Sequence, residues 1–293
     1  MKFSVITPAL NINFELEQAI KSVKEQSFTG HVIIEHFVIF DNENITLPKK
    51  IVSDNYLLEY VKVPGYKTGP SNARNKGIDL ATGDILCFLD ADDIWTSDYL
   101  SRLVLEYRER NVNYVAGNGT KLINGVDTGR LVQPYIGRQK INDSLLWNVI
   151  GCPSGYSYRR CESTKDLRFN TELRLFEDWY FYLEINKRCG PNQYGLHLGV
   201  VTYCYRVSPT QSTFFDRNFA FRFSGSKDLF VSYVGSYPFF DRLVLKIQAT
   251  RQFRRGCKKK TLFLDFLLLF LRPDYLVAQC KRLLKRVESH DKY

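Results

Sequence analysis

Short apolar runs alternate with stretches of helical periodicity over the first hundred residues. Four apolar runs have the length of buried strands: 2–7, 32–40, 58–63 and 85–89. Apolar residues recur at helical spacing, or suggest a short helix, in three segments between them: 13–24, 51–57 and 71–81. Asn13 is placed to cap the first of these helices, and Gly83 to end the last. This order predicts an α/β domain with a mostly parallel sheet and right-handed crossovers.

The pattern continues with a further helix and then changes character. A helix is expected over 97–110, and two short strands, 114–116 and 121–123, precede the turn dipeptide Asn124-Gly125. Residues 151–155 are expected to form a flexible loop. A helix over 177–187 and a strand over 196–205 follow, and only helices are expected after that. We therefore divide the chain into a domain of residues 1–215 and a helical C-terminal region of residues 216–293.

The composition is that of a globular protein that can bury a full core. Of 293 residues, 44% are hydrophobic and 25% are charged. The seven cysteines have no metal-binding spacing, and no signal peptide is evident, which favours reduced thiols in the cytoplasm. No apolar run reaches the roughly 18 residues that a membrane-spanning helix needs.

The net charge of +10 belongs to the C-terminal quarter. Residues 217–293 hold 17 Lys and Arg against 6 Asp and Glu, whereas the first 216 residues are nearly neutral. An apolar run, 262–271, follows a basic cluster there. This arrangement suits peripheral contact of 251–293 with an anionic membrane, at the inner face of the cell membrane, and it equally suits an ordinary buried helix. Because no nucleic-acid reader motif is present, we expect no nucleic-acid partner.

Polar clusters follow three of the predicted strands, at the end where α/β sheets bind ligands. They are Thr7-Pro8, Asp41-Asn42 and the run of acids at 90–93. Asp90, Asp92 and Asp93 repel one another by about 1 kcal/mol per close pair, and a divalent cation is the usual counter-charge. Oxygen-only ligands suit Mg²⁺ or Mn²⁺. Helix capping is the alternative role of these acids, and it accounts for Asp93 or Asp98 better than for Asp90.

Five motifs in order resemble those of the inverting glycosyltransferase family 2, which has the GT-A fold and includes bacterial surface-polysaccharide enzymes. The motifs are Ser4–Pro8, Asp41, Gly69–Gly77, Leu89–Asp93 and Glu177–Trp179. The resemblance covers about residues 1–215. One motif alone is weak, but five in the same order are specific.

The resemblance implies a role for each matching residue. Asp178 would be the general base, with Glu177 beside it, and Asp92 and Asp90 would hold Mn²⁺ or Mg²⁺. The nucleotide-sugar would be bound by Thr7, Pro8, Asp41, Arg74, Asp90, Ala91 and Asp92. The chemistry is consistent, because a metal and a cation stabilise a leaving diphosphate while one carboxylate takes the acceptor proton.

The expected activity is transfer of one sugar from a nucleotide-sugar, UDP-linked, to a hydroxyl of a glycan or lipid-linked glycan. A hydrolase would instead need two carboxylates flanking the bond. The second strand ends in Asp41-Asn42-Glu43 rather than in two acids followed by Gly-Ser, a departure from the family that bears on the base pocket and its uridine specificity. No QxxRW element is present, which disfavours processive synthesis. The rival hypotheses are a non-catalytic nucleotide- or carbohydrate-binding protein of the same fold and a basic nucleic-acid-binding protein.

Overall fold

A computed structural model describes residues 1–28, 30–133, 138–141, 151–190, 192–207, 225–256 and 264. The chain forms two compact units, residues 1–208 and 209–293. The strands of the first unit are β1 (Lys2–Ala9), β2 (Ile33–Phe40), β3 (Ile51–Val52), β4 (Tyr56–Lys62), β5 (Ile85–Phe88), β6 (Ile94–Trp95), β7 (Val112–Ile123), β8 (Val126–Leu131), β9 (Gln139–Ile141), β10 (Tyr156–Arg159) and β11 (Tyr194–Val207).

All these strands belong to one sheet, in the order β3-β4-β2-β1-β5-β10-β7-β11-β6, with β8 beside β7 and β9 beside β11. The neighbours β4, β2, β1 and β5 are parallel, as predicted. Beyond them β10 is antiparallel to both β5 and β7, whereas β11 runs parallel to β7. The sheet is therefore mixed, and the prediction of a mostly parallel sheet holds only for its first part. Turns too short for a crossover join β3 to β4 and β7 to β8, which makes those pairs antiparallel.

Three local predictions were wrong. Residues 51–57 form β3 and the start of β4 rather than a helix, because Ser53 closes a turn by donating from its backbone N–H to the Tyr56 carbonyl at 2.9 Å. The two strands expected near 114–123 are one strand, β7. Gly83 does not cap α2 (Pro70–Leu80), because the C-cap residue of that helix is Ala81. A Cβ at Gly83 would lie 2.6 Å from Ser4 Oγ, so close packing explains this glycine.

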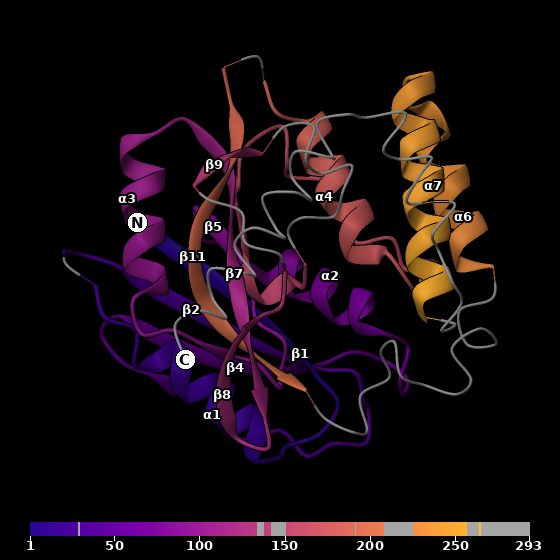
Figure 1. Cartoon of the computed structure of the whole chain (residues 1–293). Coiled ribbons are helices and arrows are strands. Elements are labelled where there is room, and N and C mark those ends of the chain that lie inside the picture. Colours follow the sequence, from indigo (N-terminus) through magenta and orange to yellow (C-terminus); the bar gives the residue numbers. More distant parts are fainter. Residues whose placement is uncertain are drawn as a thin grey trace. The chain divides into compact units, whose positions relative to one another are not determined.

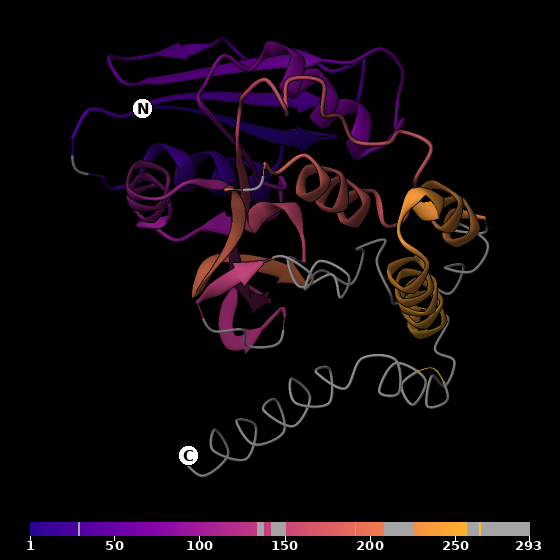
Figure 2. The ribbon, with the colours of Figure 1, turned by 90° about the horizontal axis from the view of Figure 1, so that it is seen from above.

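Helices cover both faces of the sheet (Figures 1 and 2). α1 (Phe14–Lys24) and α3 (Tyr99–Glu109) lie on one face, and α2 and α4 (Glu177–Lys187) on the other. The predicted cap is confirmed, since the Asn13 side chain accepts from Leu16 N–H at 3.0 Å. Aromatic rings fill the space under α4, where Phe181 stacks on Phe169 with 4.0 Å between centroids. This packing holds the start of α4 against the sheet.

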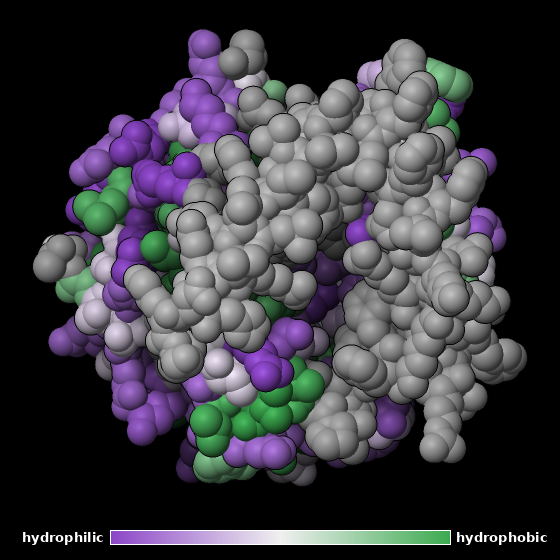
Figure 3. Space-filling view, viewed as in Figure 1, coloured by the Kyte–Doolittle hydropathy of each residue, from purple (hydrophilic) through white to green (hydrophobic). Residues whose placement is uncertain are grey.

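The second unit is helical where it is described, with α6 (Ser226–Tyr233), a single turn η3 (Val234–Ser236) and α7 (Phe239–Gly256). The apolar run 262–271, apart from residue 264, and the helix expected after 275 lie outside the described residues. Among the residues that are described, no helix has both the length and the apolar character needed to cross a membrane. The described surface in Figure 3 is mostly hydrophilic, with a hydrophobic group near its lower edge and smaller ones elsewhere, for example on the left.

Candidate active site

Arg74 is the centre of the charged cluster at the carboxyl ends of the strands. Its side chain projects from α2, is 4% exposed, and donates from Nη2 to Asp90 Oδ1 at 2.7 Å. Its Nη1 lies 3.7 Å from Glu177 Oε1, and its guanidinium lies over the Phe169 ring at 5.2 Å. Burial alone would lower the pKa of Arg74, but Asp90 and Glu177 raise it above the ordinary value, so the group stays charged.

Two polar atoms of this guanidinium have no hydrogen-bond partner among the described residues. They are Nε and Nη1 of Arg74, both inaccessible to solvent. A buried donor without a partner is costly and uncommon in native proteins. The arrangement therefore suits an anionic ligand that would accept from these two groups.

Glu177 and Asp178 form the first turn of α4, as predicted. Phe176, just before them, has a left-handed backbone with φ of 70°, which turns the chain sharply into the helix. Burial, together with the neighbouring charge of Glu177, raises the pKa of Asp178 to about 7. Burial also raises the pKa of Glu177, although Arg74 opposes that shift. Asp178 is thus a carboxylate that can take up a proton near neutral pH.

The acids after β5 occupy different environments. Asp90, Ala91 and Asp92 are partly exposed, whereas Asp93 is fully buried. Asp93 accepts from Ser154 Oγ at 2.5 Å and from Arg206 N–H at 3.1 Å, so it does not cap a helix. The N-cap of α3 is Asp98.

A metal ion could be held here. Single ligand atoms of Asp90, Asp93 and Cys152 lie within 4.8 Å of one another. Burial and the nearby charges of Asp92 and Asp90 raise the pKa of Asp93 well above its usual range. A thiol is a poor ligand for Mg²⁺ or Mn²⁺, and Asp93 already accepts hydrogen bonds from Ser154, Arg206 and the Cys152 thiol. Asp90 and Asp92 are therefore the carboxylates that could hold a hard cation here.

The residues predicted to contact the nucleobase are mostly engaged within the protein. Thr7 is fully buried, and its hydroxyl lies 2.9 Å from His36 Nε2, so Pro8 is the exposed part of this strand end. The Asp41 carboxylate accepts from Thr68 N–H at 2.9 Å, from Thr68 Oγ1 at 2.6 Å and from Gly69 N–H at 2.7 Å. Asp41 therefore fixes the loop that leads into α2.

Sequence reasoning missed two residues of this site, Ser154 and Arg206. It also missed the buried role of Asp93. Residues 151–155 were expected to be a flexible loop, but Pro153–Gly155 form a buried 3-10 turn, η2. Its Ser154 hydroxyl accepts from Asp90 N–H at 3.0 Å. No local signal marks such a serine, because its partners lie about 60 positions earlier in the chain.

Parts of the chain are similar to proteins of known identity. Residues 4–168 match the family model described as glycosyl transferase family 2. The GalNAc(5)-diNAcBac-PP-undecaprenol beta-1,3-glucosyltransferase of Campylobacter jejuni is 32% identical over 145 residues, 50% of this chain and 45% of that protein, so the match spans less than half of that relative. The UDP-Glc:alpha-D-GlcNAc-diphosphoundecaprenol beta-1,3-glucosyltransferase WfgD of Escherichia coli is 27% identical over 207 residues, 70% of this chain and 77% of WfgD.

Solved structures share the fold. The structure of S. aureus TarS 1-349 in complex with UDP-GlcNAc aligns with a TM-score of 0.63 at 18% identity, over 88% of this chain and 73% of that one. The mannosyltransferase PcManGT from Pyrobaculum calidifontis, in complex with GDP-Man and Mn2+, aligns with a TM-score of 0.51 at 16% identity, over 99% of this chain and 88% of that one. With the family match over residues 4–168, these findings show that the chain belongs to glycosyl transferase family 2 and has the GT-A fold.

Proposed function

We propose that the protein transfers a single sugar from a UDP-linked donor to a hydroxyl of a lipid-linked glycan, with inversion and with the help of a divalent cation. One observation carries this proposal. The Arg74 guanidinium contacts Asp90 at 2.7 Å and Glu177 at 3.7 Å, and so joins the acids after β5 to the helix that carries Asp178. A cation between a metal-binding acid and a candidate base suits displacement of a diphosphate by a hydroxyl.

On the donor side, Asp90 and Asp92 would hold Mn²⁺ or Mg²⁺, which supplies positive charge against the leaving diphosphate. The two partnerless N–H groups of Arg74 would donate to diphosphate oxygens. Asp90 would also touch the ribose or sugar, and Ala91 beside it would complete this part of the nucleotide-sugar site. Thr7-Pro8 and Asp41 would border the nucleobase, through Pro8 and through the loop that Asp41 holds.

On the acceptor side, Asp178 would take the proton of the attacking hydroxyl, with Glu177 beside it. A base with a pKa of about 7 is half deprotonated at neutral pH and can still accept a proton effectively. A single base opposite the diphosphate clamp implies one displacement and therefore inversion at the anomeric carbon. A retaining mechanism would need a second carboxylate positioned as a nucleophile.

The names of the relatives suggest both substrates. The C. jejuni and E. coli proteins are named for undecaprenol-linked diphosphate glycans, and TarS was crystallised with UDP-GlcNAc. We propose the same substrate classes here, with the basic segment 251–293 in peripheral contact with the cytoplasmic face of the membrane. Within that segment only 251–256 and 264 are described.

A donor screen tests the function. The full chain is incubated with individual UDP- and GDP-sugars, Mn²⁺ and an undecaprenyl-diphosphate-linked sugar, and the released nucleoside diphosphate is measured. We expect release from one UDP-sugar, greater with the lipid-linked acceptor than with the same sugar free. Mn²⁺-dependent UDP binding without release from any donor would contradict the proposal and favour a non-catalytic binding protein of the same fold.

Vesicle flotation tests the membrane contact separately. The full chain should float with vesicles that contain phosphatidylglycerol and should stay behind with neutral vesicles or at high salt, because the attraction of the basic segment is electrostatic. Equal behaviour with both kinds of vesicle would contradict this part of the proposal.

A further inference from the structure

The η2 turn contacts the donor loop, which we define as residues 90–95, at three points. The Ser154 hydroxyl accepts from Asp90 N–H at 3.0 Å and donates to Asp93 Oδ2 at 2.5 Å. The Ser154 carbonyl accepts from the Trp95 indole N–H at 2.6 Å. One fully buried residue thus holds the beginning, middle and end of the loop that carries the predicted metal ligands.

Ser154 is itself held in place by close packing. A Cβ on the next residue, Gly155, would lie 2.6 Å from a ring carbon of Tyr203 and 3.0 Å from the Gly117 carbonyl oxygen. Pro153 restricts the backbone on the other side, and β10 begins directly after the turn, at Tyr156. The hydroxyl therefore has little freedom to move away from the donor loop.

A second residue, Arg206, also holds the donor loop. Arg206, near the end of β11, donates from its backbone N–H to Asp93 Oδ1 at 3.1 Å and from Nε to the Asp92 carbonyl at 3.0 Å. Its Nη2 donates to Gln18 of α1 at 2.6 Å. Asp93 is therefore fixed between η2 and β11, and its carboxylate serves the loop rather than a ligand.

We infer that Ser154 is a positioning residue, which holds the donor loop in the geometry that lets Asp90 and Asp92 bind a divalent cation together with a nucleoside diphosphate. This inference rests on the proposed function. Groups that hold metal ligands by hydrogen bonds set the affinity of the site, and losing one typically costs 10- to 100-fold in metal binding.

A purely structural role is the alternative, and Ser157 provides the matched control. It is also fully buried, and it lies three residues later, on β10. Its hydroxyl lies 3.0 Å from Tyr107 Oη and donates to the Val115 carbonyl at 3.4 Å, and neither partner belongs to the donor loop. Ser157→Ala removes a comparable buried hydroxyl without touching residues 90–95.

The experiment compares wild type, Ser154→Ala and Ser157→Ala as full chains. Mn²⁺ is titrated in the presence of UDP, and free Mn²⁺ is followed by electron paramagnetic resonance. The Mn²⁺ concentration for half-maximal donor turnover is measured in parallel. We expect Ser154→Ala to weaken Mn²⁺ binding about tenfold, with a much smaller change in turnover at saturating Mn²⁺. Ser157→Ala should bind Mn²⁺ as wild type does, even if both variants melt at lower temperature.

The outcomes separate the two proposals. Equal Mn²⁺ binding by both variants and wild type, with normal wild-type turnover, would overturn the role of Ser154 alone. A wild type that binds no Mn²⁺ with UDP and turns over no donor would overturn the proposed function and this inference with it. If Ser154→Ala does not fold, Trp95→Phe removes the hydrogen bond from the indole N–H to the Ser154 carbonyl instead. Weaker Mn²⁺ binding by that variant would support the inference, and unchanged binding would overturn it.

Discussion

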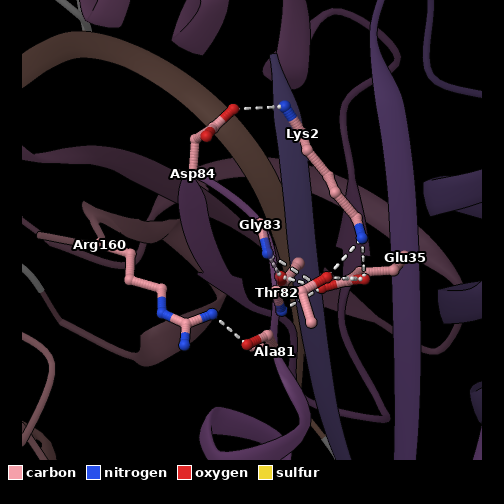
Figure 4. A network of polar contacts seen from close by, with 8 residues as sticks. Lys2, Glu35, Ala81, Thr82, Gly83, Asp84 and Arg160 are labelled. Atoms are coloured by element: carbon pink, nitrogen blue, oxygen red, sulfur yellow. Dashed lines mark hydrogen bonds and ion pairs between the residues drawn. The ribbon is translucent and has the colours of Figure 1, made fainter.

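Buried carboxylates lie at both ends of the parallel strands, and their surroundings differ. Near the amino ends, Glu35 of β2 is 3% exposed and accepts from Ser4 Oγ at 2.5 Å, from Thr82 N–H at 2.5 Å, from Thr82 Oγ1 at 2.8 Å and from Gly83 N–H at 3.1 Å. Lys2 Nζ lies 2.5 Å from Glu35 Oε2, the oxygen that also accepts from Thr82 Oγ1. Figure 4 shows Lys2, Thr82 and Gly83 converging on the Glu35 side chain. Burial alone would raise the pKa of Glu35, but the bonds from Lys2, Ser4 and Thr82 lower it below the usual value.

At the carboxyl ends, burial prevails over the hydrogen bonds that the acids accept. The pKa values of Asp93, Glu177 and Asp178 are all raised, in each case chiefly by burial. Arg74 is shared between Asp90 and Glu177 and keeps two donors without partners. The contrast teaches that burial does not distinguish a structural acid from a functional one. The sign of the pKa shift differs between the two ends, because the hydrogen bonds and Lys2 together outweigh burial at Glu35, whereas burial prevails at Asp93, Glu177 and Asp178.

The largest expected effect is that of removing divalent cations. If the acids after β5 need a cation as their missing partner, EDTA should abolish donor turnover, and Mn²⁺ or Mg²⁺ should restore it. The melting temperature should change little, because the groups that stabilise the buried Glu35 carboxylate all come from the protein. Released nucleoside diphosphate and thermal unfolding are measured on the same samples. Full turnover in EDTA would contradict the claim that the acids after β5 need a cation.

Asp178→Asn should have the next largest effect. Loss of the base should lower kcat by a factor on the order of 10² to 10³ while the KM for the donor stays near its wild-type value. Steady-state kinetics with saturating acceptor measures both constants. Glu184→Gln, on the same helix and paired with Lys187 at 3.0 Å, is the control and should leave both unchanged. A kcat near wild type in Asp178→Asn would show that the base lies elsewhere.

Glu35→Ala tests the amino end. Removing the carboxylate leaves several buried donors without an acceptor, so we expect a loss of about 3 kcal/mol in unfolding free energy. Turnover per folded molecule should be unchanged. Urea unfolding gives the free energy, and Glu59→Ala on β4 should change it by less than about 0.5 kcal/mol. Lost turnover in fully folded Glu35→Ala would contradict the separation of the two ends.

The last prediction concerns the pH dependence of stability. Because the pKa of Asp178 is about 7 when folded and about 4 when unfolded, the folded state binds the proton more tightly. Stability should fall as pH rises from about 4 to about 7. The Asp178→Asn variant has no such decrease in stability, because its side chain does not ionise. Its melting temperature should therefore exceed that of wild type at pH 8 and equal it at pH 4. A gain that is equal at both pH values would contradict a raised pKa.

Local signals in the sequence were enough for much of the fold and for several elements that carry the candidate site. The cap at Asn13, the turn at Asn124-Gly125 and the first turn of α4 depend on near neighbours, and all three were predicted. The antiparallel entry of β10, the buried role of Asp93 and the contacts of Ser154 depend on partners far away in the chain. No periodicity reports such pairings, so they had to come from the structure.

The place of β10 in the sheet has a consequence for the order in which the chain folds. β4, β2, β1 and β5 all lie within the first 88 residues, so they can assemble while the ribosome is still making the rest. The outer edge of β5 then stays open until β10 is synthesised more than 60 residues later. An unpaired apolar edge invites association between nascent chains. We therefore expect that truncation before Tyr156 yields an aggregating fragment, and that slowing translation across 89–155 lowers the yield of soluble protein.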